Sequence, residues 1–166
     1  MKTLTLIRHA KSSWDDVTLT DSQRPLNRRG ERDAPKMADR LAARGFKPDL
    51  IVASPAVRAS TTADIVASKL QYPREKIVRE ASLYLASLDE LLDITASQDD
   101  SLSHLVLVGH NPGLTLYANQ LVPGVTNNVP TMGVVSVSLD RDDWALYTDP
   151  HARLDFFDYP KKLGAH

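Results

Sequence analysis

The sequence predicts a three-layer α/β/α fold with a mainly parallel sheet. Three short apolar runs, 3–8, 50–53 and 104–108, are typical of buried strands and lie far apart in the chain. Segments of helical periodicity separate them, and strands that alternate with helices favour a parallel sheet covered on both faces. The chain has 166 residues, of which 42% are hydrophobic and 25% charged, so we expect a single domain over 1–166 with a substantial core.

The first half of the chain is expected to begin with a strand and then to alternate helices with strands. Pro25 marks a loop, Gly45 suits the end of a helix, and Ser54-Pro55 suits the start of one. In chain order, the expected elements are a strand over 3–8, a loop over 12–27, a helix over 27–44, a strand over 50–53, a helix over 56–70 and a short edge strand over 76–79.

The second half continues the alternation and ends in an antiparallel addition. Ser87-Leu88-Asp89-Glu90 is a capping box, and Pro112 after Asn111 is typical of a helix start. In chain order, the expected elements are a helix from Ser87 to about Ser97, a strand over 104–108, a helix over 114–121 and a strand over 134–139 that forms a hairpin with 144–147. Residues 150–166 contain proline and aromatic residues and match no element pattern.

Composition excludes several classes of function. A formal net charge of −1 gives no electrostatic reason to expect binding to nucleic acid or to an anionic membrane surface. The sequence has no cysteine, which excludes disulfides, thiolate zinc sites and phosphatases with a cysteine nucleophile. No apolar stretch reaches transmembrane length and no export signal is visible, so a cytoplasmic location is the expectation. We expect neither a metal nor a cofactor.

Histidine and arginine residues follow each of the three predicted parallel strands. Arg8 and His9 end the first strand, Arg58 comes shortly after the second, and His110 follows the third. Ligands of open α/β sheets bind at the carboxyl ends of the strands. Two arginines can hold a phosphoryl group bidentately, and a neutral imidazole of His9 or His110 can attack it. The sequence therefore predicts a phosphoryl site with a nucleophile inside it.

Four segments in this order resemble the histidine phosphatase superfamily, the phosphoglycerate-mutase-like proteins. The agreement in order and spacing extends from about residue 3 to residue 139. Two departures are Ala10, where the family usually has glycine, and Asp15, where many members have asparagine. The four segments are the opening motif Arg8-His9-Ala10-Lys11-Ser12-Ser13-Trp14-Asp15, the helix start Pro25-Leu26-Asn27-Arg28-Arg29-Gly30, the segment Ser54-Pro55-Ala56-Val57-Arg58-Ala59-Ser60-Thr61-Thr62-Ala63 and the second-histidine motif Gly109-His110-Asn111-Pro112.

The resemblance implies a role for each matching residue. His9 is the expected nucleophile, which becomes a phosphohistidine. Arg8, Arg58 and His110 are expected to hold the phosphoryl oxygens and to stabilise the charge in transfer. The implied fold is a phosphoglycerate-mutase-like sheet, and the implied chemistry needs no metal.

A carboxylic acid is expected to protonate the leaving group, and its identity stays open at this point. Glu80 is the match by position, whereas Asp15 and Asp21 in the loop after the nucleophile are rivals. Asp15 is also a candidate for contact with the phosphate, and Arg24 is a candidate for contact with the substrate.

The stretch between Glu80 and His110 is too short to contain a lid in addition to the capping-box helix. We therefore expect an open site, which suits a phosphorylated side chain presented by another protein. In length, in Arg24-Pro25-Leu26 and in the missing lid, the chain resembles the small SixA-type branch, whose members remove phosphate from phosphohistidine on signalling proteins. The alternatives are a phosphomonoesterase acting on small molecules and a catalytically inactive module that binds a phospho-ligand or a protein.

Overall fold

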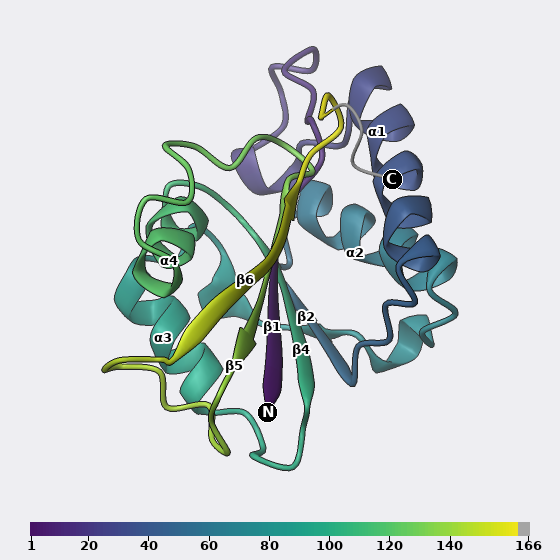
Figure 1. The fold of residues 1–166 in the computed structure, drawn as a ribbon. Helices are drawn as coiled ribbons and strands as arrows, with labels where there is room; N and C mark the ends of the chain where they lie inside the picture. Colours follow the sequence, from purple (N-terminus) through teal and green to yellow (C-terminus); the bar gives the residue numbers. More distant parts are fainter. Residues whose placement is uncertain (163–166) are drawn as a thin grey trace.

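The computed structural model describes residues 1–162, in which six strands form one sheet of order β3-β2-β4-β1-β5-β6 (Figure 1). The first four strands in this order run parallel, whereas β5 and β6 run antiparallel to their neighbours. The predicted mainly parallel sheet is therefore confirmed. Residues 163–166 of the expected domain lie outside the described residues. The strands are β1 Lys2–Arg8, β2 Leu50–Ala53, β3 Val78–Arg79, β4 His104–Gly109, β5 Val134–Leu139 and β6 Ala152–Asp158.

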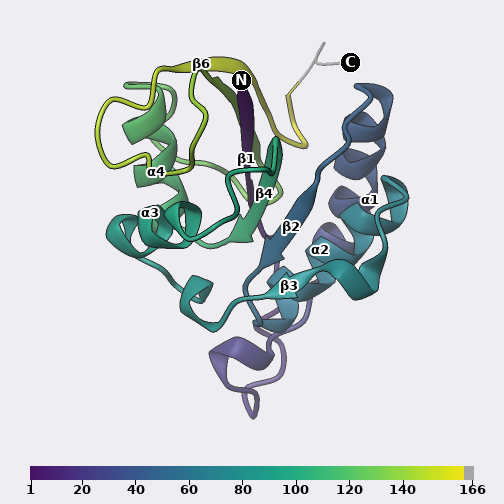
Figure 2. The same ribbon diagram turned by 90° about the horizontal axis from the view of Figure 1, so that it is seen from below.

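Helices cover both faces of this sheet, as predicted. Helices α1 (Arg28–Ala43) and α2 (Val57–Lys69) lie on one face, and α3 (Leu88–Ala96) and α4 (Gly113–Leu121) lie on the other (Figures 1 and 2). Successive strand residues point to opposite faces, so β4 contributes alternate side chains to two core clusters, one under each pair of helices. Within residues 1–162, no helix combines the length and the apolar character needed to span a bilayer.

Local signals explain where the helices begin and end. The Asn27 side chain accepts a hydrogen bond from the Gly30 amide and starts α1, and Gly45, with φ of +75°, follows its end. Ser87 and Glu90 form the expected capping box of α3. The expected helices and strands therefore agree with the structure to within a residue or two, except at the edge strand β3 and at the C-terminal hairpin.

The predicted partner of β5 was wrong. Residues 144–147 form no strand, and β6 pairs with β5 instead, from within the stretch that matched no pattern. Trp144 is fully buried in the core cluster under α3 and α4, so packing against helices replaces strand pairing there. Strand β6 is a half-exposed edge strand. Its buried and exposed residues alternate only weakly, so the sequence pattern did not predict it. The edge strand expected over 76–79 is shortened to β3 because residues 74–76 form a 3-10 helix.

The loop over 12–27 folds back on the carboxyl ends of the parallel strands, and it projects beyond the sheet in both ribbon views (Figures 1 and 2). The Asn27 amide donates to the Lys11 carbonyl, and an isolated bridge joins Ser12 to Leu26. Gly30 packs directly on Lys11, since a Cβ at Gly30 would lie 2.1 Å from that carbonyl oxygen. The start of α1 therefore holds both ends of this loop beside the carboxyl edge.

Candidate active site

The carboxyl edge of the sheet brings the two arginines and two histidines of the predicted phosphoryl site into one pocket of about 230 Å³. Arg8 ends β1 and His9 follows it, Arg58 lies in the first turn of α2, and His110 follows β4. The ring centroids of His9 and His110 are 5.2 Å apart. The other residues that line this pocket are Lys11, Ser12, Trp14, Arg24, Leu85, Asn111 and Thr131.

His9 is held as a neutral imidazole. Its Nδ1 lies 2.7 Å from the Ala10 carbonyl oxygen, and because a carbonyl only accepts, Nδ1 carries the ring proton. The other ring nitrogen, Nε2, then holds the lone pair. The pKa of His9 is lowered to about 3, mainly by burial and also by the nearby His110, Arg58 and Arg8, although the hydrogen bond to the Ala10 carbonyl acts in the opposite direction. At neutral pH the ring is therefore unprotonated at Nε2, as a nucleophile must be.

The backbone after His9 is tied to α2. The Ala10 amide donates to Thr62 Oγ1 at 3.0 Å, and the Thr62 hydroxyl donates to the Arg58 carbonyl oxygen at 2.7 Å. Thr62 therefore connects the strand that carries His9 with the helix that carries Arg58. Ala10 itself packs in the core cluster under α1 and α2, so its departure from the usual glycine places a methyl group in the core.

His110 is oriented by a buried serine. Its Nε2 lies 2.7 Å from Ser54 Oγ, and that oxygen also accepts a hydrogen bond from the Ala56 amide. Among the described hydrogen bonds the Ser54 hydroxyl has no other acceptor, so we assign its proton to the bond with His110 Nε2, and the proton of the neutral imidazole is then on Nδ1. Burial lowers the pKa of His110 to about 4, with Arg58 contributing in the same direction. Nδ1 is buried without a hydrogen-bond partner among the described residues, so it can donate to a bound oxyanion.

Arg58 is held by Asp21. The guanidinium donates to the Asp21 carbonyl oxygen at 2.7 Å and to its carboxylate at 2.9 Å. The Tyr84 hydroxyl donates to the same carboxylate, and this hydrogen bond, followed by the charges of Arg58 and Arg24, lowers the pKa of Asp21. Because its carboxyl group is held ionised, Asp21 is poorly suited to donate a proton.

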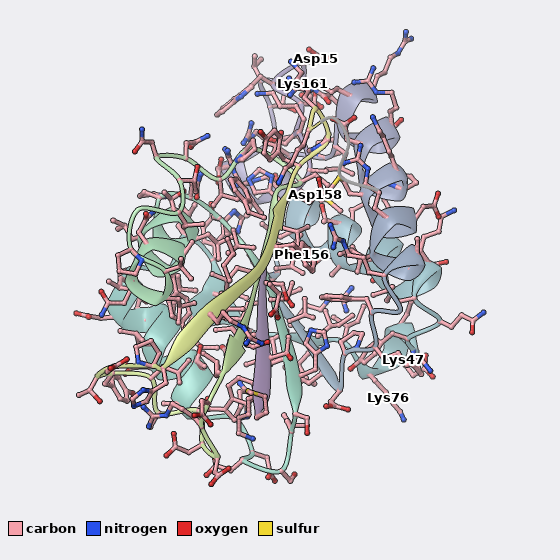
Figure 3. The ribbon with its side chains drawn as sticks, in the orientation of Figure 1. Asp15, Lys47, Lys76, Phe156, Asp158 and Lys161 are labelled. Carbon is pink, nitrogen blue, oxygen red and sulfur yellow. The ribbon has the colours of Figure 1, made fainter. Side chains whose placement is uncertain are left out.

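The remaining predicted residues have different places. Arg24 lines the pocket, is buried and pairs with Asp21 at 3.3 Å. Glu80 follows β3 at the same edge, but its carboxylate accepts from the Ser82 amide at 3.1 Å and caps a 3-10 helix. Asp15 is exposed at the outer tip of the loop (Figure 3). Among residues 1–162, neither Glu80, Asp15 nor Asp21 is one of those that line the pocket.

Several residues of the site were missed from the sequence. Ser54 and Thr62 lay inside a recognised segment, so the motif itself was a signal that could have found them. Tyr84 and Leu85 lay outside every motif and had no such signal. In the described part of the chain, no cluster of three or more histidine, aspartate or glutamate side chains has an arrangement that could hold a metal ion.

Acidification is expected to destabilise the fold through the two site histidines. Their pKa values in the folded state lie below the ordinary value of 6.5, so the unfolded chain binds protons that the folded chain excludes. The contribution of the two histidines to the free energy of unfolding is therefore fully present above about pH 6.5. It is lost as the pH falls toward the folded-state pKa values of about 4 for His110 and about 3 for His9. Thermal midpoints measured from pH 8 to pH 4 should fall less steeply for His9→Asn than for the wild type.

His151→Asn is the matched control for this experiment, because His151 is exposed. This variant should keep the wild-type dependence of the thermal midpoint on pH. Equal slopes in His9→Asn and the wild type would show that His9 is not held neutral by its surroundings.

Fold and pocket together define an α/β protein with a cationic, histidine-containing pocket at the carboxyl edge of its sheet. The family model of the histidine phosphatase superfamily (branch 1) matches residues 4–84. The SixA protein of Agrobacterium tumefaciens superposes with a TM-score of 0.83 at 27% identity, over 96% of this chain and 98% of that one. The chain belongs to the histidine phosphatase superfamily and has the SixA fold.

Other relatives extend the comparison. An uncharacterised chloroplastic protein of Arabidopsis thaliana is 36% identical over 149 residues, which cover 85% of this chain and 68% of that protein. The mitochondrial serine/threonine-protein phosphatase Pgam5 of Drosophila melanogaster is 37% identical over 78 residues, which are 47% of this chain and 26% of Pgam5. The match thus spans about a quarter of the length of Pgam5. A SixA complexed with tungstate has a TM-score of 0.79 at 21% identity, over 95% of this chain and 97% of that one.

Proposed function

We propose that this protein is a metal-independent phosphatase that removes the phosphoryl group from phosphohistidine on another protein. The main observation in support of this proposal is that a neutral His9 lies in one pocket with Arg8, Arg58 and His110. Two guanidinium groups and an imidazole N–H match the oxygens of a phosphoryl group in charge and in hydrogen bonding. A SixA of the same fold binds tungstate, which is a tetrahedral oxyanion like phosphate, and this supports the proposal.

The first chemical step would be attack by His9 Nε2 on phosphorus. A bond forms between Nε2 and phosphorus while the bond from phosphorus to the substrate nitrogen breaks, and the electron pair leaves with the substrate imidazole. The negative charge on the phosphoryl oxygens would be met by Arg8 and Arg58. His110 Nδ1–H would donate to a third oxygen, in the orientation that Ser54 holds.

The second step would be attack by water on the phosphohistidine at His9, which releases inorganic phosphate and restores the imidazole. A proton must reach the leaving group in the first step, and Glu80 remains our proposal for its donor. To act, its carboxyl group would have to leave the Ser82 amide and turn toward the pocket. Imidazole is a good leaving group, so phosphohistidine is the substrate that least needs a positioned acid.

The segment between Glu80 and β4 supports a large substrate. Residues 81–83 form a 3-10 helix, and α3 follows it and packs with α4 on the core instead of covering the pocket. A phosphorylated side chain on another protein can therefore approach from solvent. We also propose that the chain acts as one domain, because both core clusters pack on the same sheet.

Phosphate release in the presence of a metal chelator tests the proposal. Purified protein is given a phosphohistidine-carrying protein and, in parallel, a small phosphomonoester. We expect chelator-resistant release from the phosphoprotein and little from the ester. Release from the ester alone would keep the mechanism but make the protein a small-molecule phosphatase. No release from either would favour a phospho-ligand binding module.

Ser54→Ala is expected to lower kcat/KM by about tenfold or more, because a misplaced or wrongly protonated His110 loses a charge-assisted hydrogen bond to the phosphoryl group. Long-range ¹H–¹⁵N spectra of histidine-labelled protein should show that the Nδ1–H form of His110 is no longer preferred. Ser60→Ala is the matched control, since the Ser60 hydroxyl donates to the Ser54 carbonyl oxygen rather than to His110. Equal kinetics and equal His110 spectra in both variants would refute the role of the Ser54 hydroxyl.

A further inference from the structure

Two large apolar side chains stand at the mouth of this polar pocket. Trp14 is 71% exposed and Leu85 is 52% exposed, and both line the pocket that holds Arg8, His9 and Arg58. They come from separate parts of the chain, Trp14 from the loop over 12–27 and Leu85 from the turn that leads into α3. Exposed apolar surface beside a binding site is typical of contact with a partner.

Trp14 is placed by a fixed arginine. The Arg24 guanidinium lies 3.5 Å from the centre of the Trp14 ring, and Arg24 is itself buried and held by the Ser13 carbonyl oxygen and by Asp21. Stacking on this arginine orients the indole while most of its surface stays open to solvent. The indole ring is therefore already ordered beside the pocket, so substrate binding does not have to bear the entropic cost of ordering it.

Leu85 occupies a backbone conformation that leucine rarely adopts. Its φ is +49°, in the left-handed region that glycine or asparagine accepts more readily. Its neighbours enforce this conformation, because Leu83 is buried in the core and the Ala86 backbone carbonyl packs against Gly113. Such strain beside a binding site points to a use for the side chain itself.

We propose that Trp14 and Leu85 contact the substrate polypeptide on either side of the phosphorylated residue. These contacts would select protein substrates with apolar side chains next to that residue. The inference rests on the proposed function and names what would decide its specificity. The cationic pocket would take the phosphoryl group, while the two apolar side chains bury the flanking apolar groups of the substrate. A small polar phosphate ester has no apolar flanking groups to bury against these side chains.

Two phosphohistidine peptides of equal length test the proposal, one with leucine and one with serine on both sides of the phosphohistidine. The wild type is expected to have a KM about tenfold lower for the leucine peptide, at similar kcat. Trp14→Ala and Leu85→Gly should abolish this preference by raising the KM for the leucine peptide to that for the serine peptide. Leu154→Ala, at a position on β6 that is 38% exposed and outside the pocket, is the control that should keep it.

Leu85→Gly also separates recognition from folding. Glycine accepts the left-handed backbone of this position, so the thermal midpoint of this variant should be unchanged or raised although the peptide preference is lost. An equal KM for both peptides in the wild type, or a preference that survives both substitutions, would overturn the inference while the phosphatase activity stands.

The affinities of the two peptides, measured by titration calorimetry, test recognition separately from activity. If the wild type hydrolyses no substrate, the proposed function fails. Tighter binding of the leucine peptide that depends on Trp14 and Leu85 would then still support the recognition role, whereas equal binding would remove it as well.

Discussion

His9→Ala is expected to lower the rate of phosphate release by about a thousandfold or more, since His110, the other imidazole of the pocket, has its Nε2 paired with Ser54 and is not placed to replace the nucleophile. His9 Nε2 carries the lone pair at neutral pH because the Ala10 carbonyl holds the proton on Nδ1 and burial keeps the ring uncharged. Steady-state release from a phosphohistidine protein measures the loss. Rapid alkaline quenching followed by mass spectrometry should find phosphate on the peptide that contains His9 in the wild type.

The controls for this experiment separate chemistry from binding. His151→Ala, at an exposed position outside the pocket, should keep the wild-type rate. His9→Ala should still bind the phosphoprotein, because Arg8, Arg58 and His110 remain. A His9→Ala protein that releases phosphate at the wild-type rate would rule out the covalent mechanism through His9.

Gly113→Ala is expected to lower the free energy of unfolding by about 3 kcal/mol, which for a chain of this size is roughly 6–12 °C in thermal midpoint. A Cβ at Gly113 would lie 2.1 Å from the Ala86 carbonyl oxygen, and both are backbone-anchored. Alanine favours a helix over glycine by about 1 kcal/mol, which offsets only part of this clash. Thermal and urea unfolding both measure the effect.

Gly109→Ala is the matched control, four residues earlier. A Cβ there would meet Leu83 at 3.8 Å, an ordinary contact, so the thermal midpoint should change little. Equal midpoints for the two variants would show that α4 can move away from the turn before α3 at little cost. The comparison therefore tests how tightly this turn, which carries Leu85, is held.

Short-range patterns explain why so much of the fold could be predicted. A capping residue such as Asn27 or Ser87 acts on amides three residues away, and strand alternation repeats every two residues. These signals lie within a few positions of one another, so they can be read along the chain. They located α1 and α3, and the apolar runs located β1, β2 and β4 with His9, Arg58 and His110 at their carboxyl ends.

The contacts that complete the pocket depend instead on residues that are distant in sequence. Tyr84 reaches Asp21 across 63 positions, and Ser54 reaches His110 across 56. Such contacts depend on the packing of whole elements, and no local pattern encodes them. Glu80 is the opposite case, because its carboxylate accepts a hydrogen bond from the Ser82 amide, which is local in sequence.

The residues alone were sufficient to predict the layers, the parallel strands and the edge where arginines and histidines gather, because hydrophobic periodicity and strand direction decide these. Folding in three dimensions decided which strand pairs with β5, which ring nitrogen of His110 faces Ser54, and which side chains line the pocket mouth. Each of these depends on a neighbour supplied by another element. Local patterns therefore determined the layers of the fold, whereas burial and hydrogen bonding between distant segments determined the detailed geometry of the pocket.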